Sequence, residues 1–249
     1  MQMAEKTTIR ETKPTSPRAE GSSRDSRRQS EGSCWSCGAA ADARHFCPAC
    51  NKVQPQPPDT DFFRFFGLER KLALDTAALE RQFYELSWKL HPDNFHNASG
   101  YEQELSLAKS AVLNDAWRTL RDPVARVEYL LGLEGVRREG DIKQQAPPDL
   151  LEEVFELNEY LEELRDARRS GGDARQMQEL RHRLEQARHT FEVKMEGVLA
   201  ELTAQFPAFD GASNDGARKA ALEKMSEILN RHSYVRNLVR NVTDELDEE

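Results

Sequence analysis

The sequence contains no apolar run that approaches the roughly 20 residues of a membrane-spanning helix. It also lacks an excess of positive charge, since 44 acidic and 35 basic residues give a formal net charge of −9. Proteins that bind nucleic acids generally present a basic surface. Sustained alternation of β-branched and polar residues is absent, and long segments rich in Leu, Glu, Arg and Ala take its place. These features predict an all-α protein with neither a membrane nor a nucleic acid as its partner.

Two further absences concern chemistry. The sequence shows no Gly-rich phosphate-binding loop, and no nucleophile stands at a spacing from a base that would argue for catalysis. We therefore expect no enzyme activity and look for binding surfaces instead.

Residues 1–33 are rich in Ser, Thr, Arg and Glu and nearly free of large apolar side chains. Such a segment cannot bury enough surface to offset the entropy of ordering it, so we expect a disordered tail. It lacks the apolar core of a secretory signal, and interspersed acids such as Glu5, Glu11 and Glu20 are unusual for a mitochondrial presequence. We expect a cytoplasmic protein if the chain is bacterial, and a protein of the mitochondrial matrix if it is eukaryotic.

All four cysteines lie within residues 34–52, as two C-x-x-C pairs. This spacing is typical of two knuckles that bring four thiolates to one ion, and a tetrahedral thiolate site suits zinc, with iron as the alternative. Two disulfides or free thiols remain open, although a cytosolic compartment disfavours disulfides. A complete set of thiolates leaves no open coordination position, so the metal would be structural. The expected ligands are Cys34, Cys37, Cys47 and Cys50.

Other residues of this segment have secondary roles in the prediction. Gly38 permits the turn that a knuckle needs, and Trp35 and Phe46 are candidates to cover the ion. His45 could replace one cysteine as a ligand, but four thiols are already available. Residues 53–60 are rich in proline and predict a stiff linker.

Helical patterns follow this linker. A short apolar helix ends at Gly67, and Asp75 is the N-cap of a helix with an apolar stripe that runs to Leu90. A second long helix and a third that opens at Asp122-Pro123 complete a helical hairpin with flanking helices.

Residues 147–247 predict an antiparallel bundle of three long helices. Asp149 and Glu152 stand at the spacing of a capping box at its start. Gly171-Gly172 ends its first helix and Pro207 stops its second.

The tripeptide His91-Pro92-Asp93 lies where the stripe to Leu90 ends. Proline lacks a backbone N–H and biases the preceding residue away from helix, so the tripeptide forms a stiff turn. It could be merely a helix stop, or an acid–base pair, but no pocket is evident around it. We interpret it as an exposed binding epitope.

Residues 61–136 resemble a J-domain, the module by which co-chaperones activate DnaK-class ATPases. The match is closer to the HscB-type co-chaperones of iron–sulfur cluster assembly, and the cysteine segment resembles the metal-binding extension of their animal-type members. The matching motifs are Phe65-Phe66-Gly67-Leu68, Leu74-Asp75, His91-Pro92-Asp93, Glu102-Gln103, Ser110-Ala111, Asn114 to Leu120 and Tyr129-Leu130-Leu131.

This resemblance implies that the His-Pro-Asp loop docks on a DnaK/HscA-type ATPase chaperone, with Arg81 and Lys89 on the preceding helix as basic contacts. Asn94 stands where many members have lysine. It also implies that the C-terminal bundle holds the cluster scaffold protein. The implied scaffold-binding residues are Leu151, Glu152, Phe155, Glu156, Glu159 and Tyr234, with Glu152 at a position where the family commonly has methionine.

Two rival functions remain open at this stage. One is a general J-domain chaperone for unfolded clients, which requires a promiscuous apolar groove. The other is an iron-handling or redox protein that uses the four cysteines directly.

Overall fold

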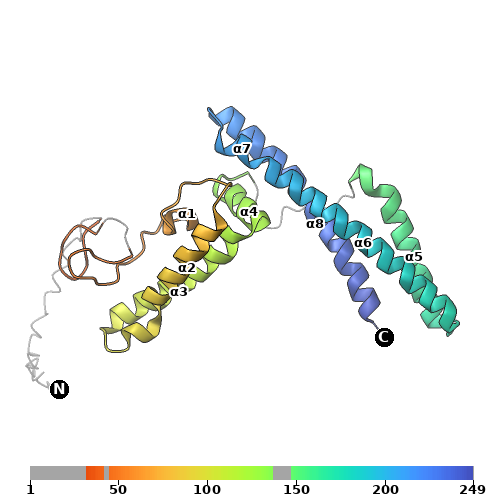
Figure 1. Ribbon diagram of the computed structural model, residues 1–249, viewed down its shortest axis with the longest axis horizontal. Coiled ribbons are helices and arrows are strands. Elements are labelled where there is room, and N and C mark those ends of the chain that lie inside the picture. Colours follow the sequence, from red (N-terminus) through yellow and green to blue (C-terminus); the bar gives the residue numbers. More distant parts are fainter. Residues whose placement is uncertain (1–31, 42–44, 137–146, 249) are drawn as a thin grey trace, which may run out of the picture.

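The computed structural model describes residues 32–41, 45–136 and 147–248, so the expected tail at 1–33 lies almost entirely outside the described residues. The described chain is helical, apart from two isolated β-bridges in the cysteine segment. None of its helices is long and apolar enough to cross a membrane. The elements, shown in Figure 1, are α1 (Phe62–Phe65), α2 (Thr76–Leu90), η1 (Pro92–Phe95), α3 (Gly100–Arg121), α4 (Pro123–Leu133), η2 (Pro148–Leu150), α5 (Leu151–Ser170), α6 (Ala174–Ala204), α7 (Phe206–Asp210) and α8 (Asp215–Asp247).

Helices α2 and α3 form the expected hairpin, with α1 and α4 packed against α3. The Asp75 side chain accepts a hydrogen bond from the Ala78 N–H at 2.9 Å, which confirms the predicted N-cap of α2. Asp122 caps α4 in the same way, with proline at the first helical position. Gly67 has φ +68°, as expected for a residue that follows a helix end in the left-handed region.

The C-terminal bundle is built on α6, which packs along α8 and against α5 (Figure 1). Gly171 ends α5 in the left-handed conformation, with φ +70°, as predicted. The expected capping box at the start of α5 does not form, because a 3-10 turn precedes the helix and Leu150 occupies its N-cap position without a side-chain hydrogen bond. Pro207 does not terminate α6 directly. Helix α6 ends at Ala204, and Pro207 lies in the first turn of α7.

The hydrophobic core has two parts. The first joins the hairpin to α7 and the N-terminal half of α8, and the second lies between α5, α6 and the rest of α8. Polar contacts reinforce the first part. The Asp210 carboxylate of α7 accepts hydrogen bonds from the N–H groups of Leu72 and Ala73, each at 2.8 Å. The hairpin and the bundle therefore meet through a continuous packed core.

Candidate functional site

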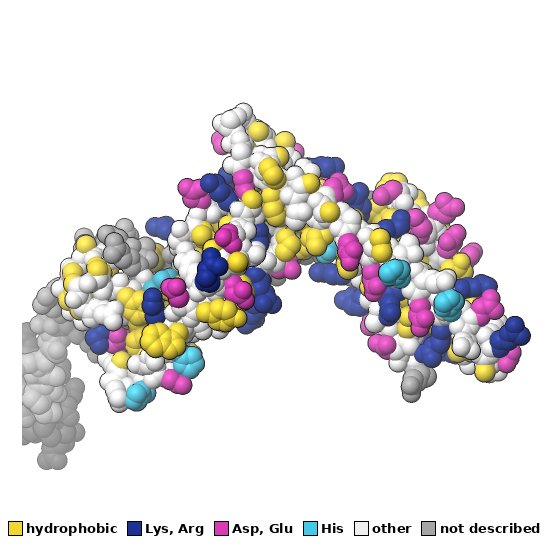
Figure 2. All heavy atoms as spheres, viewed as in Figure 1, with side chains coloured by type: hydrophobic (Ala, Val, Ile, Leu, Met, Phe, Trp, Pro, Cys, Tyr) yellow, Lys and Arg dark blue, Asp and Glu magenta, His cyan; other side chains and the backbone are white. Residues whose placement is uncertain are grey.

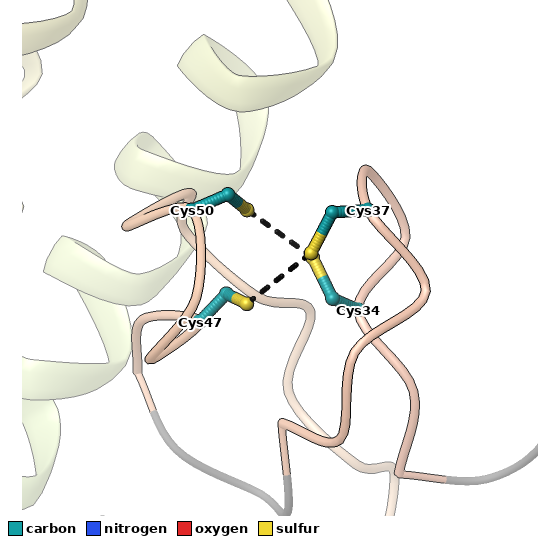
Figure 3. A group of neighbouring side chains, drawn as sticks. All are labelled: Cys34, Cys37, Cys47 and Cys50. Carbon is teal, nitrogen blue, oxygen red and sulfur yellow. Dashed lines mark hydrogen bonds between the residues drawn. The ribbon is translucent and has the colours of Figure 1, made fainter.

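The four cysteine sulfur atoms face one another from two knuckles (Figure 3), and all lie within 4.8 Å of each other. The Sγ atoms of Cys34 and Cys50 are 3.6 Å apart, and those of Cys37 and Cys47 are 3.7 Å apart. A tetrahedral site with metal–sulfur bonds of about 2.3 Å separates its sulfur atoms by about 3.8 Å, whereas a disulfide needs about 2.05 Å. The thiols are free and their arrangement fits a single tetrahedral ion, so the disulfide alternative is wrong.

The two knuckles share one backbone plan. In each, the N–H of the residue after the second cysteine donates to the carbonyl of the first, from Gly38 to Cys34 at 3.0 Å and from Asn51 to Cys47 at 2.9 Å. Both donors have positive φ, +75° for Gly38 and +57° for Asn51. Asn is one of the few side chains that tolerate this region. The glycine turn was predicted from the sequence, and its asparagine counterpart was not.

The aromatic residues of this segment contact the hairpin. Trp35 donates from Nε1 to the Val53 carbonyl at 2.6 Å, and its ring meets Tyr101 of α3 edge-on at 4.9 Å. Phe46 packs against the first core. The small core around the sulfur atoms contains only alanine and cysteine side chains. The expectation that Trp35 and Phe46 cover the ion is therefore replaced by a role in seating the knuckles on the hairpin.

His45 does not belong to the cysteine cluster. Its Nε2 lies 3.0 Å from the Phe65 carbonyl oxygen, and its Nδ1 lies 3.3 Å from the Lys109 ammonium. Because ammonium can only donate, Nδ1 accepts and Nε2 carries the proton that is donated to Phe65. Burial, followed by the charge of Lys109, lowers the pKa of His45 to about 4. His45 is thus a neutral residue between the knuckle and the hairpin, and not a metal ligand.

The His-Pro-Asp loop forms the tip of the hairpin, at the end remote from α7 (Figure 1). The side chains of His91 and Asp93 are 56% and 90% exposed. The Asp93 N–H donates to His91 Nδ1 at 3.3 Å, which orients the imidazole. Behind the loop, the hydroxyls of Ser106 and Ser110 donate to the Leu90 carbonyl at 2.7 and 2.9 Å and fix the end of α2. The loop is therefore exposed and held from behind.

Arg81 and Lys89, predicted to accompany this loop, are exposed on α2. Lys89 lies 3.9 Å from Glu85, so its charge is partly balanced within the helix. Two neighbours on the same exposed face were missed, Tyr84 and Trp88, which are 62% and 75% exposed. The sequence could have indicated them, because two aromatic residues four positions apart lie side by side on a helix, here outside the apolar stripe. Trp88 is also tied to the loop, since the Asn94 side chain donates to its carbonyl at 2.6 Å.

Leu151 and Phe155, on the first two turns of α5, are 42% and 69% exposed. Acidic side chains gather with apolar ones at this end of the molecule in Figure 2, and Glu152, Glu156 and Glu159 are all exposed. A shallow cleft of about 200 Å³ lies beside them between α5 and α6, lined in part by Glu156. We call this exposed part of α5 the acidic–apolar surface.

Tyr234 of α8 differs from the other predicted scaffold-binding residues because it is half-buried and packs against the second core. The structure still places it near the start of α5. Val154 packs against the same core, and Asp149 lies 4.0 Å from Arg231, one helical turn before Tyr234.

No protein-family profile matches the chain. It is 37% identical over 139 residues to an iron–sulfur cluster co-chaperone HscB homologue of Arabidopsis thaliana, a match that covers 56% of this chain and 54% of the relative. It is 28% identical over 213 residues to HscB of Mus musculus, which covers 84% of this chain and 80% of the relative. The chain thus spans about half the length of the plant relative and most of the mouse relative.

Two solved structures are also similar. The crystal structure of human HscB superposes with a TM-score of 0.64 at 25% identity, covering 87% of this chain and 100% of that chain. HscB from Vibrio cholerae gives a TM-score of 0.52 at 26% identity, covering 74% and 96%. With the helical hairpin and the C-terminal bundle in place, these likenesses show that the chain is similar in sequence and in fold to the HscB iron–sulfur cluster co-chaperones.

Proposed function

We propose that the protein is a non-enzymatic co-chaperone that holds an iron–sulfur cluster scaffold protein and delivers it to a DnaK/HscA-type ATPase. The observation that carries the proposal is the placement of two separate exposed surfaces on one connected helical body. The His-Pro-Asp loop lies at the tip of the α2–α3 hairpin, and the acidic–apolar surface lies on α5 of the C-terminal bundle (Figure 1).

The loop acts on the ATPase by differential binding. A partner shifts an ATPase between conformations only if it binds one of them better than the other. A stiff turn suits this role, because little conformational entropy is lost when it docks. His91 uses Nδ1 within the loop, which leaves Nε2 to contact the chaperone, and the exposed carboxylate of Asp93 offers a second polar contact.

The α2 face next to the loop supports docking in two ways. Arg81 and Lys89 supply positive charge, which speeds association with an acidic ATPase surface. The neighbouring Glu85 reduces this charge. Tyr84 and Trp88 add an exposed aromatic area, and aromatic residues are enriched at the buried centres of interfaces. Docking in this protein therefore depends less on charge than on the aromatic pair.

The acidic–apolar surface binds the scaffold. Leu151 and Phe155 form its apolar centre, and Glu152, Glu156 and Glu159 form a carboxylate rim. An apolar core with a polar rim is the common plan of protein interfaces, and this charge selects a partner with basic residues around an apolar patch. Glu152 widens the acidic rim at a position where the resemblance implies an apolar contact.

The four cysteines hold a structural metal ion, which we propose to be zinc. Four thiolates close the coordination sphere, so the ion would organise the knuckles and take no part in a reaction. Visible absorption of the purified protein separates the two candidate metals, because an iron–thiolate site is coloured and a zinc site is not.

Two sets of substitutions, each expected to remove one activity and leave the other unchanged, test the proposed function. Replacing His91 with Gln should abolish stimulation of the partner ATPase and leave scaffold affinity unchanged, while the matched change of exposed His189 on α6 to Gln should alter neither. Replacing Leu151 and Phe155 with Ala should weaken scaffold binding at least tenfold, because two apolar anchors are lost. The control is Leu107→Ala, which truncates an exposed apolar side chain on α3. If His91→Gln still stimulates the ATPase, or the double variant keeps its scaffold dissociation constant, the corresponding surface is wrongly assigned.

A further inference from the structure

The cysteine knuckles are fastened to α3 through two charged residues that are unusually deeply buried. Glu102 and Lys109 are each 3% exposed, although charged side chains are rarely buried unless they are paired. They stand seven residues apart, which is about two helical turns, so they lie on one face of α3. This face of the hairpin carries the knuckles.

Within the described residues, the side-chain hydrogen bonds of both charges go to segment 45–53. Glu102 accepts from the Lys52 ammonium at 2.6 Å and from the Val53 N–H at 3.4 Å. Lys109 lies 3.3 Å from His45 Nδ1. Removing the partner of a buried charge is strongly destabilising, because the charge stays out of water without compensation. The stability of the folded α3 therefore depends on whether this segment is in place.

Phe46 and Val53 pack against the core of the hairpin, but the part of the segment around the thiols has only a small core of its own. Its own buried core consists of Cys34, Ala41 and Cys47, with two partly buried neighbours. Metal binding and folding are coupled in small segments of this kind, since a preformed site rarely exists in the unfolded chain. Lys52 and Val53 stand two and three residues after Cys50, so an ion held by Cys47 and Cys50 positions the residues that reach Glu102.

The face of α3 that receives the knuckles also holds the His-Pro-Asp loop. Glu102 belongs to the first turn of α3, whose N-cap is Ser99. This turn follows the His-Pro-Asp loop closely in the chain. Ser106, one turn further, donates to the Leu90 carbonyl at the end of α2. His91 is the next residue, so the Lys52–Glu102 and Ser106–Leu90 hydrogen bonds, joined by one turn of α3, connect the metal site to the exposed loop.

We propose that metal binding at the four cysteines stabilises the first turns of α3 and the adjoining His-Pro-Asp loop, with Glu102 as the residue that couples them. The ion organises segment 45–53, which brings the Lys52 ammonium and the Val53 N–H to the buried carboxylate. Coupling of this kind is reciprocal. If bound metal strengthens the Glu102 contact by a certain factor, loss of the Glu102 contact must weaken metal binding by the same factor. The coupling does not depend on the proposed function. Only its effect on a chaperone ATPase rests on that function.

The first test measures zinc affinity of the full chain by competition with a chelating dye. Glu102→Gln should weaken the affinity by on the order of tenfold. Glu104→Gln, which removes an exposed carboxylate from the same helix, should leave it unchanged. Equal zinc affinities for the two variants would overturn the proposal.

The second test is hydrogen exchange of residues 90–106 with and without zinc. In the wild type, removal of zinc should accelerate exchange there, and in Glu102→Gln the response to zinc should be much smaller. Exchange that is independent of zinc in the wild type contradicts the coupling. Lys52→Gln provides a milder change from the knuckle side, where the lysine side chain is 41% exposed, and it should also weaken zinc binding. Both readouts use the protein alone, so their failure is distinguishable from failure of the chaperone function.

Discussion

The junction between the hairpin and the bundle contains one carboxylate whose removal has a calculable cost in stability. Asp210 accepts from the N–H groups of Leu72 and Ala73 at 2.8 Å, across more than 130 positions of sequence. A hydrogen bond to a charged acceptor contributes about 1.5–3 kcal/mol when its donor has no other partner. Leu72 is fully buried, so its N–H would stay unpaired, whereas the N–H of the exposed Ala73 would donate to water instead.

We therefore expect Asp210→Ala to lower the free energy of unfolding by about 2 kcal/mol, nearly all of it from the Leu72 donor. Asp210→Asn keeps one acceptor oxygen and should cost about half as much, roughly 1 kcal/mol. The assay is urea unfolding followed by circular dichroism, with the exposed loop residue Asp59 changed to Ala as the control. If Asp210→Ala unfolds at the wild-type urea concentration, the carboxylate does not secure the junction between the hairpin and the bundle.

Two further predictions concern the hairpin. Burial lowers the pKa of Lys109 from 10.5 to about 8, so between these pH values the folded state binds fewer protons than the unfolded state and the free energy of unfolding should rise with pH. Between pH 8 and pH 9 the free energy of unfolding of the wild type should rise by about 1 kcal/mol relative to that of Lys109→Met. Parallel pH profiles of the two proteins would show that Lys109 is not a buried cation. Trp88→Ala should change stability by less than about 0.5 kcal/mol because the side chain is exposed, yet raise the concentration for half-maximal ATPase stimulation about tenfold; an unchanged concentration would remove the aromatic pair from the docking face.

Much of the framework follows from local rules. The caps at Asp75 and Asp122, the left-handed end of α5 at Gly171 and the four clustered thiols each depend on a few neighbouring residues. Local geometry decides such features, so the sequence alone predicts them. The exposure of His91 belongs to the same class, because a proline after a buried stripe leaves the preceding residue outside the helix.

Features that depend on distant partners could not be predicted in this way. Glu102 and Lys109 look like ordinary charges on the solvent face of an amphipathic helix, and their burial arises from a segment about 50 to 64 positions earlier. Trp35 was expected over the ion because the hairpin surface that receives it was not visible in the sequence. Pro207 was expected to end a helix, but proline is equally suited to the first turn of a new one, as in α7.

We propose that one connected chain presents separate surfaces to a chaperone ATPase and to its scaffold cargo. The most direct measurement is the binding of purified ATPase to the wild-type protein with and without saturating scaffold, followed by analytical ultracentrifugation. Our account predicts a ternary complex with one copy of each component and an ATPase affinity that the scaffold does not reduce. Displacement of the ATPase by the scaffold would show that the two partners share one surface, and would contradict the account.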